Sequence, residues 1–185
     1  DEDDYFQSSL FMIARRRILW LLILVLANGL TTKVIAMNDQ ILKEIVLLAA
    51  FIPLLIGTGG NVGAQSSTVV IRGLSTQKLK SLGAIKAVVK EAITGALLGV
   101  LMMLVVFPFA WWQGEGPLIA SAVGISLISI TTLAATTGAI LPLLFDRMRL
   151  DPALMSSPFI TTITDIAGVF IYLSTAKWLL SSSLN

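Results

Sequence analysis

Five apolar stretches, each long enough to cross a bilayer, constrain this chain more than any other feature. A helix needs roughly 20 apolar residues to span the hydrocarbon core. Hydrophobic residues make up 56% of the 185 residues and charged residues only 13%, against about 25% charged in soluble domains. This composition excludes a soluble globular domain. The sequence predicts an all-α membrane protein with five transmembrane helices, over residues 18–37, 44–71, 87–109, 118–144 and 153–180.

The basic residues orient these spans. If the N-terminus is inside the cell, the inner segments carry ten of the thirteen basic residues and the outer segments carry three. Positive charge marks the cytoplasmic side of membrane proteins. We therefore expect a multi-pass protein of the inner (plasma) membrane with its N-terminus in and its C-terminus out. The ten are Arg15, Arg16, Arg17, Arg72, Lys78, Lys80, Lys86, Lys90, Arg147 and Arg149; the three are Lys33, Lys43 and Lys177.

Two regions differ in composition. Residues 1–14 start with an acidic run, unlike a signal peptide, which starts with basic residues. We interpret them as the end of a cytosolic connecting segment. We expect residues 15–185 to form the transmembrane domain, which would contain any pore, and the sequence contains no low-complexity linker that would indicate a second domain.

The chain contains no cysteine and no histidine. Disulfides, iron–sulfur sites, zinc sites built on Cys or His, and nucleophilic triads with a His base are therefore excluded. Any metal ion would be held by oxygen atoms, which favours hard cations such as Mg²⁺, Ca²⁺ or Mn²⁺.

A glycine- and amide-rich segment, residues 57–74, follows directly on an apolar run. Such a segment is tolerated at membrane depth only where it packs against protein or lines a wet cavity. If it is helical, its polar residues recur every three or four positions and share one face. We interpret that face as one wall of an ion path that runs toward the inner surface; interhelical hydrogen bonding by the two amides is an equal alternative. The face carries Thr58, Asn61, Gln65, Thr68 and Arg72.

Asp165 is the partner that we expect for this polar face. It lies about a dozen residues into the last span, near the middle of the bilayer, where an ionised aspartate costs at least about 2.5–3.5 kcal/mol. It should therefore face a cavity, a cation or a polar partner. Thr161 and Gly168 share its face of the helix. Hydroxyl groups beside a carboxylate are suited to binding a hydrated divalent ion. Pairing of Asp165 with Asn61 or a threonine for packing is the alternative.

Glu91 is assigned a simpler role than Asp165. Glu91 lies next to Lys90 near the inner interface, where a solvated pair is expected.

The candidate site residues fall into two groups. Asp165 and Thr161 are the metal-binding candidates, and the pore-lining candidates are Asn61, Gln65, Thr68, Gly168 and Thr164, the residue before Asp165.

Two strings carry a resemblance to a known family. GTGGNVGAQSSTVVIRGL at 57–74 and PFITTITDIAGVFIY at 158–172 resemble the membrane domain of the MgtE family of Mg²⁺ channels. The resemblance implies a homodimer with five helices per subunit and a pore at the subunit interface. It also implies that the second and fifth helices line the pore, and that Asp165 of both subunits binds Mg²⁺ on the axis.

The resemblance therefore implies a Mg²⁺-selective channel that conducts the ion into the cell, with Mg²⁺ as both transported and bound ion. The expected partners are a second copy of the chain, membrane lipids and divalent cations, with no nucleic acid. Regulated bacterial members also carry a cytosolic N-terminal domain and paired CBS domains. Only residues 1–10 could be the end of such a connection, so we expect this regulatory part to be removed or absent.

Three other functions are weighed against the channel. A proton- or ion-coupled carrier of Mg²⁺, Mn²⁺ or Co²⁺ is not separated from it by sequence. An intramembrane hydrolase would need a second deep carboxylate or a His base, so we do not expect an enzyme. A membrane scaffold without transport would leave the polar face and Asp165 unexplained.

Overall fold

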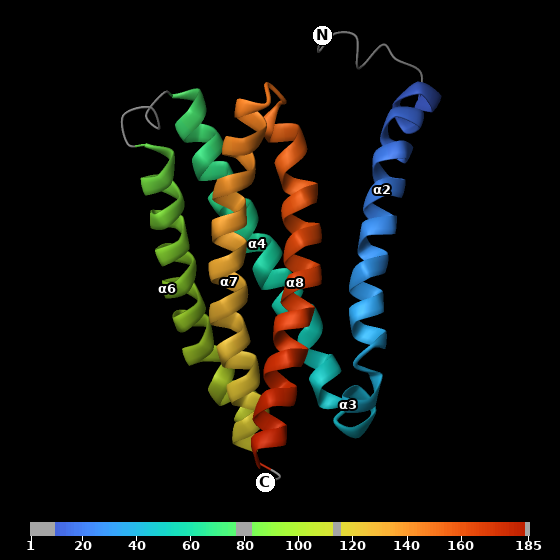
Figure 1. The fold of residues 1–185 in the computed structure, drawn as a ribbon, viewed down its shortest axis with the longest axis vertical. Helices are drawn as coiled ribbons and strands as arrows, with labels where there is room; N and C mark the ends of the chain where they lie inside the picture. Colours follow the sequence, from blue (N-terminus) through green and yellow to red (C-terminus); the bar gives the residue numbers. More distant parts are fainter. Residues whose placement is uncertain (1–9, 77–82, 113–115, 184–185) are drawn as a thin grey trace.

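The computed structural model describes residues 10–76, 83–112 and 116–183, and this part of the chain is all helical (Figure 1). Four of the helices contain a stretch long and apolar enough to cross a membrane, namely α4, α6, α7 and α8. They correspond to four of the five predicted spans. The helices are α2 (Leu10–Ala36), α3 (Asp39–Glu44), α4 (Leu47–Ser75), α6 (Ala84–Ala110), α7 (Gly116–Arg147) and α8 (Pro152–Ser183).

Helix α2 covers the first predicted span and packs against α8 alongside the bundle (Figure 1). Its strongly apolar part, Leu21–Ala36, is shorter than the other four. The span is confirmed as a helix, and its crossing of the membrane stays a prediction. Residues 10–14, which we expected in the connecting segment, form the first turns of α2, and residues 1–9 lie outside the described residues.

Helix α7 lies at the centre of the bundle and packs against α6, α4 and α8. Helix α4 is continuous through Pro53 and the glycine run, and it crosses the bundle obliquely (Figure 1). The core between these helices contains fully buried Leu127 and Ile130 of α7 and Tyr172 of α8. The Tyr172 hydroxyl donates a hydrogen bond of 3.0 Å to the carbonyl oxygen of Leu48 in α4. This bond ties the start of α4 to the second half of α8.

Glycines let the helices approach closely. A Cβ atom on Gly138 of α7 would contact the carbonyl oxygen of Gly63 in α4, and one on Gly95 of α6 would lie 2.5 Å from the carbonyl oxygen of Thr131. Small residues at such crossings are typical of membrane helix pairs, because lipid supplies no hydrophobic force between helices and packing must supply the attraction. The α4–α7 and α6–α7 pairs are therefore stabilised by close van der Waals packing of their backbones.

Local signals end α7 and begin α8. Arg149 has a φ of 59°, and the amides of Arg149 and Leu150 donate to the carbonyls of Asp146 and Phe145 at 3.0 and 2.9 Å. This is the pattern of a Schellman motif. The Asp151 carboxylate then accepts a hydrogen bond of 2.8 Å from the Ala153 amide, beside Pro152, the first residue of α8. The last turn of α7 is thus fixed in place.

The basic residues separate along the bundle as predicted. Helices α2, α6 and α8 begin, and α4 and α7 end, at one end of the bundle, whereas α8 ends at the other (Figure 1). The first end carries Arg72, Lys86 and Arg147, and we call it the basic end; Lys78 and Lys80 lie outside the described residues. Lys33, Lys43 and Lys177 belong to the opposite end. The orientation of the basic end toward the cytoplasm stays a prediction.

We predict that Gly63→Ala destabilises the bundle. The added methyl group would overlap Ile160 of α8 and lie 3.3 Å from the carbonyl oxygen of Ala134 in α7. Overpacking of this kind costs about 1–3 kcal/mol, which thermal unfolding in detergent would detect as a lower Tm. Gly57→Ala is the matched control on the same helix, because nothing lies within 4 Å of its Cβ position. An equal loss in both variants would contradict the close α4–α7 packing.

Candidate ion path along α4 and α8

The polar stripe of α4 lies on the outside of the bundle. Residues 58–72 are helical as predicted, and the side chains of Asn61, Gln65, Thr68 and Arg72 are all exposed. Neither amide side chain forms a hydrogen bond with any described residue, so the interhelical bonding considered for Asn61 and Gln65 is not seen within one chain. We call this surface the α4 polar face.

The threonine hydroxyls of this face donate hydrogen bonds within their own helix. Thr58 and Thr68 donate hydrogen bonds of 2.7 and 2.9 Å to the carbonyls of Leu54 and Ala64, one turn back in the helix. Such back-bonding leaves the hydroxyl oxygen with lone pairs that can accept a further hydrogen bond or a metal ion. The opposite side of α4, which includes Gly63 and Ser66, is buried against α7.

Asp165 and Thr161 lie on α8 beside this face. The Cβ position of Gly60 lies 3.8 Å from the Thr161 methyl group, so the two helices are in contact here. Asn61 follows Gly60 in α4, and Asp165 comes one turn after Thr161 in α8, so both are close to this contact. Thr161 is exposed and Asp165 half-buried. In the part of the chain that the structure describes, the Asp165 carboxylate has no hydrogen bond or ion pair, and no pairing with Asn61 or a threonine is seen.

Two pore-lining candidates lie inside the bundle. Thr164 is fully buried and donates hydrogen bonds to the carbonyls of Ile160 and Thr161 at 2.9 and 3.0 Å. Gly168 is buried against Ile130 of α7, 3.6 Å from its Cβ position. These two residues pack α8 against its neighbours in the chain, whereas the side chains of Asn61, Gln65, Thr68 and Thr161 are exposed on the outside of the bundle.

Ser66 is a polar partner that the sequence analysis missed. Its hydroxyl donates a hydrogen bond of 2.7 Å to the carboxylate of Glu91, joining α4 to α6. We expected Glu91 to form a solvated pair with Lys90, and no such ion pair exists among the described residues. The expectation was wrong because it considered only neighbours in sequence. The serine on the buried side of α4 was the signal that could have indicated an interhelical bond.

The described residues contain no cluster of three or more acidic side chains that could by itself enclose a metal ion. Among the described residues, Asp165 is the carboxylate in the middle of a spanning helix, and Thr161 of α8 and Asn61 of α4 add hydroxyl and amide oxygens near it. Oxygen ligands of this kind suit Mg²⁺, which usually keeps several of its waters. Such a set could hold a hydrated ion in passing, and a closed site would need more ligands than one chain supplies.

Comparison with known proteins gives a consistent set of relatives. The sequence pattern of the MgtE family, described as divalent cation transporters, matches residues 52–175, a range that contains every residue of the candidate path. Three curated relatives are each named magnesium transporter MgtE. The chain is 39% identical to the protein of Thermus thermophilus over 166 residues, 32% to that of Bacillus subtilis over 176, and 34% to that of Enterococcus faecalis over 168.

These alignments cover 89–95% of the chain but only 36–39% of the relatives. The chain thus spans less than two fifths of the length of the curated relatives that it matches.

We predict that cysteines on the α4 polar face react with a membrane-impermeant thiol reagent. The chain has no cysteine, so each introduced thiol is read without background. Asn61→Cys and Gln65→Cys should be labelled in the membrane, because thiolates form only where water reaches them. Val105→Cys, on the exposed apolar side of α6, and the buried Thr164→Cys should stay unlabelled. Labelling that follows exposure alone, with Val105→Cys reacting as fast as Gln65→Cys, would refute a wet path.

Proposed function

The chain belongs to the MgtE family of divalent cation transporters, and we propose that it forms the membrane-spanning part of a Mg²⁺ channel. The family and the apolar helices make it a multi-pass protein of the plasma membrane. Because the family is one of transporters, the chain is not an enzyme, in agreement with the sequence analysis. The names of the three relatives support Mg²⁺ as the substrate.

One observation carries the proposal: a carboxylate in the middle of a spanning helix, without a partner among the described residues, lies on α8 next to the exposed polar row of α4. Asp165 comes fourteen positions into the 32-residue helix α8, and the α4 polar face continues from Asn61 toward the basic end. Carboxylate, amide and hydroxyl oxygens are the ligands of hard cations. A polar row of this kind across a membrane is what an ion path requires.

We further propose that a second copy of the chain covers this face. Lipid tails cannot hydrogen-bond Asn61 and Gln65, and an ionised Asp165 against lipid would cost at least about 2.5–3.5 kcal/mol. Two-fold association through α4 and α8 would face both polar surfaces toward each other and enclose water between them. Asp165 of each subunit would then approach the axis, and the pore would lie at the interface of a homodimer.

Within such a pore the ion would keep part of its water shell. Two Asp165 carboxylates would balance the charge of one Mg²⁺, and Asn61, Gln65 and Thr161 would contact its waters. Thr68 would continue the path toward the basic end. With a negative potential inside the cell, entry is favoured by about 2.3 kcal/mol per charge per 100 mV, and so by about twice that for a divalent ion. The proposed direction of flow is therefore into the cell.

We predict that Asp165→Asn abolishes Mg²⁺ uptake into proteoliposomes at a fixed membrane potential, because the neutral amide removes the charge that holds the ion. The loss should be at least about tenfold, as expected when 1.4 kcal/mol or more of ion binding is removed. The dimer should remain intact in size-exclusion chromatography. Asp146→Asn is the control, since that exposed carboxylate lies in the last turn of α7 at the basic end, whereas Asp165 lies in the middle of α8.

Equal uptake in the chain and in Asp165→Asn would overturn the role of Asp165 and move the site toward Asn61 and Gln65. If neither transports, direct Mg²⁺ binding by calorimetry decides: binding lost in Asp165→Asn supports the site, and binding unchanged contradicts it. Uptake that requires a pH gradient and saturates at low turnover would favour the ion-coupled carrier over the channel.

A further inference from the structure

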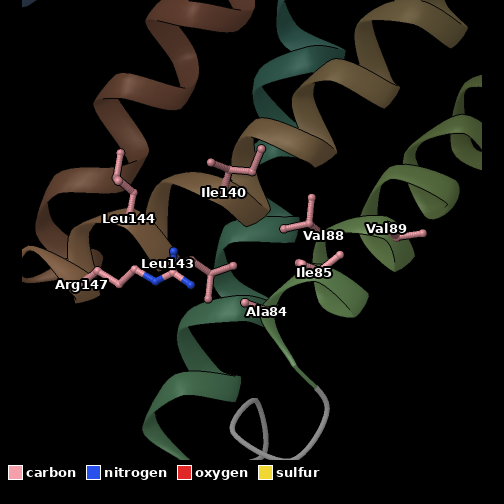
Figure 2. A pocket seen from close by; sticks show the side chains of 8 residues that line it. All are labelled: Ala84, Ile85, Val88, Val89, Ile140, Leu143, Leu144 and Arg147. Carbon is pink, nitrogen blue, oxygen red and sulfur yellow. The ribbon is translucent and has the colours of Figure 1, made fainter.

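An apolar groove separates α6 from α7 at the basic end of the bundle (Figure 2). It has a volume of about 330 Å³, and several of its side chains, among them Ile85, Val89 and Leu144, are exposed on the outside of the bundle. Seven of the eight lining residues are apolar and the eighth is an arginine. The lining consists of Ala84, Ile85, Val88, Val89, Ile140, Leu143, Leu144 and Arg147.

The groove changes from charged to apolar along its length. Arg147 lies in the last turn of α7 and Ala84 is the first residue of α6, so both mark the basic end. Ile140 comes two turns earlier in α7, about 10 Å deeper along the helix axis. The groove thus has a charged end at the depth of the lipid head groups and an apolar part below it. A phospholipid, with a charged head group and apolar tails, has the matching arrangement.

Arg147 is free to bind an anion. It is exposed, and it forms no ion pair with any described residue, although Asp146 precedes it in the helix. The Schellman motif at Arg149 and Leu150 fixes the turn that carries it. Lys86, which follows the lining residue Ile85, adds positive charge at the same end. A guanidinium binds phosphate oxygens through two parallel hydrogen bonds, which a lysine cannot do.

The outer side of α6 indicates that lipid surrounds this groove. Most of its exposed side chains are large and apolar, and the exposed polar ones, Lys86, Lys90 and Thr94, lie in the half of the helix nearer the basic end. The apolar ones include Ile85, Val89, Ile93, Leu97, Leu101, Leu104 and Val105. A purely apolar partner surface would cover the groove but leave the Arg147 charge uncompensated, whereas an anionic lipid supplies both an apolar chain and a negative charge.

We propose that the α6–α7 groove binds one anionic phospholipid of the leaflet at the basic end. Its acyl chain lies between Val88 and Leu143, and its phosphate binds Arg147. Basic pockets between membrane helices are known to select such head groups. The groove lies between α6 and α7, so this site is separate from the proposed ion path on α4 and α8.

Native mass spectrometry of the detergent-solubilised chain, titrated with phosphatidylglycerol or phosphatidylcholine, tests the proposal. We expect tighter binding of phosphatidylglycerol, and an affinity about tenfold lower in Arg147→Gln, through loss of the charge-assisted pair. Arg149→Gln is the matched control, because this arginine is exposed two residues further on and does not line the groove. It should change the affinity by less than about twofold.

Val88→Phe tests the apolar half independently of Arg147. The larger side chain fills the groove, so binding of phosphatidylglycerol should fall while Arg147 is still present. Equal losses in Arg147→Gln and Arg149→Gln would overturn the site in favour of general surface charge. Undiminished binding in Val88→Phe would overturn the placement of the acyl chain. A changed oligomeric mass in Val88→Phe would overturn the proposal by making the groove an interface between copies.

Discussion

The close approach of α4 to α7 at Gly63 and Gly138 determines which side of α4 can face outward. Without side chains at this crossing, the two backbones meet directly, and the buried residues of α4 next to it, from Gly59 to Ser67, are glycines, serines and one valine. Helical periodicity then places Asn61 and Gln65 on the opposite side. The tight contact inside the chain and the polar surface outside it are therefore two results of one helix rotation. A change that loosens the crossing would also turn the amides.

A path with a single acid per chain is suited to passage more than to storage of an ion. Conduction requires binding that is favourable enough for entry and weak enough for release. A cluster of several carboxylates around a bare ion would bind too tightly to release it quickly. In the proposed path, Asp165 among neutral oxygens would leave most of the water shell in place and so keep to a minimum the dehydration that Mg²⁺ resists.

The extent to which the sequence predicted the structure differs between elements. Four spans, the charge separation and the α4 polar face followed from apolar length, basic residues and a spacing of three to four residues, all of which are local properties. The rotation of α8 did not follow: Thr164, next to Asp165, is fully buried in the bundle, and its hydroxyl donates to the Ile160 carbonyl of its own helix. The Ser66–Glu91 bond was missed for the same reason, since it joins residues 25 positions apart across a helix contact that no local pattern specifies.

The threonine hydroxyls of the proposed path also bear on whether a cation or an anion would be favoured there. Thr58, Thr68 and Thr161 each direct the hydroxyl proton back to a carbonyl of their own helix, so the outward side of each group is an oxygen lone pair. An anion such as chloride would meet the negative end of each of these dipoles. A cation or the oxygen-bound shell of water around it meets them in the attractive orientation. In the proposed path these hydroxyls would therefore favour cations over anions in addition to Asp165, through dipoles that each helix holds in place.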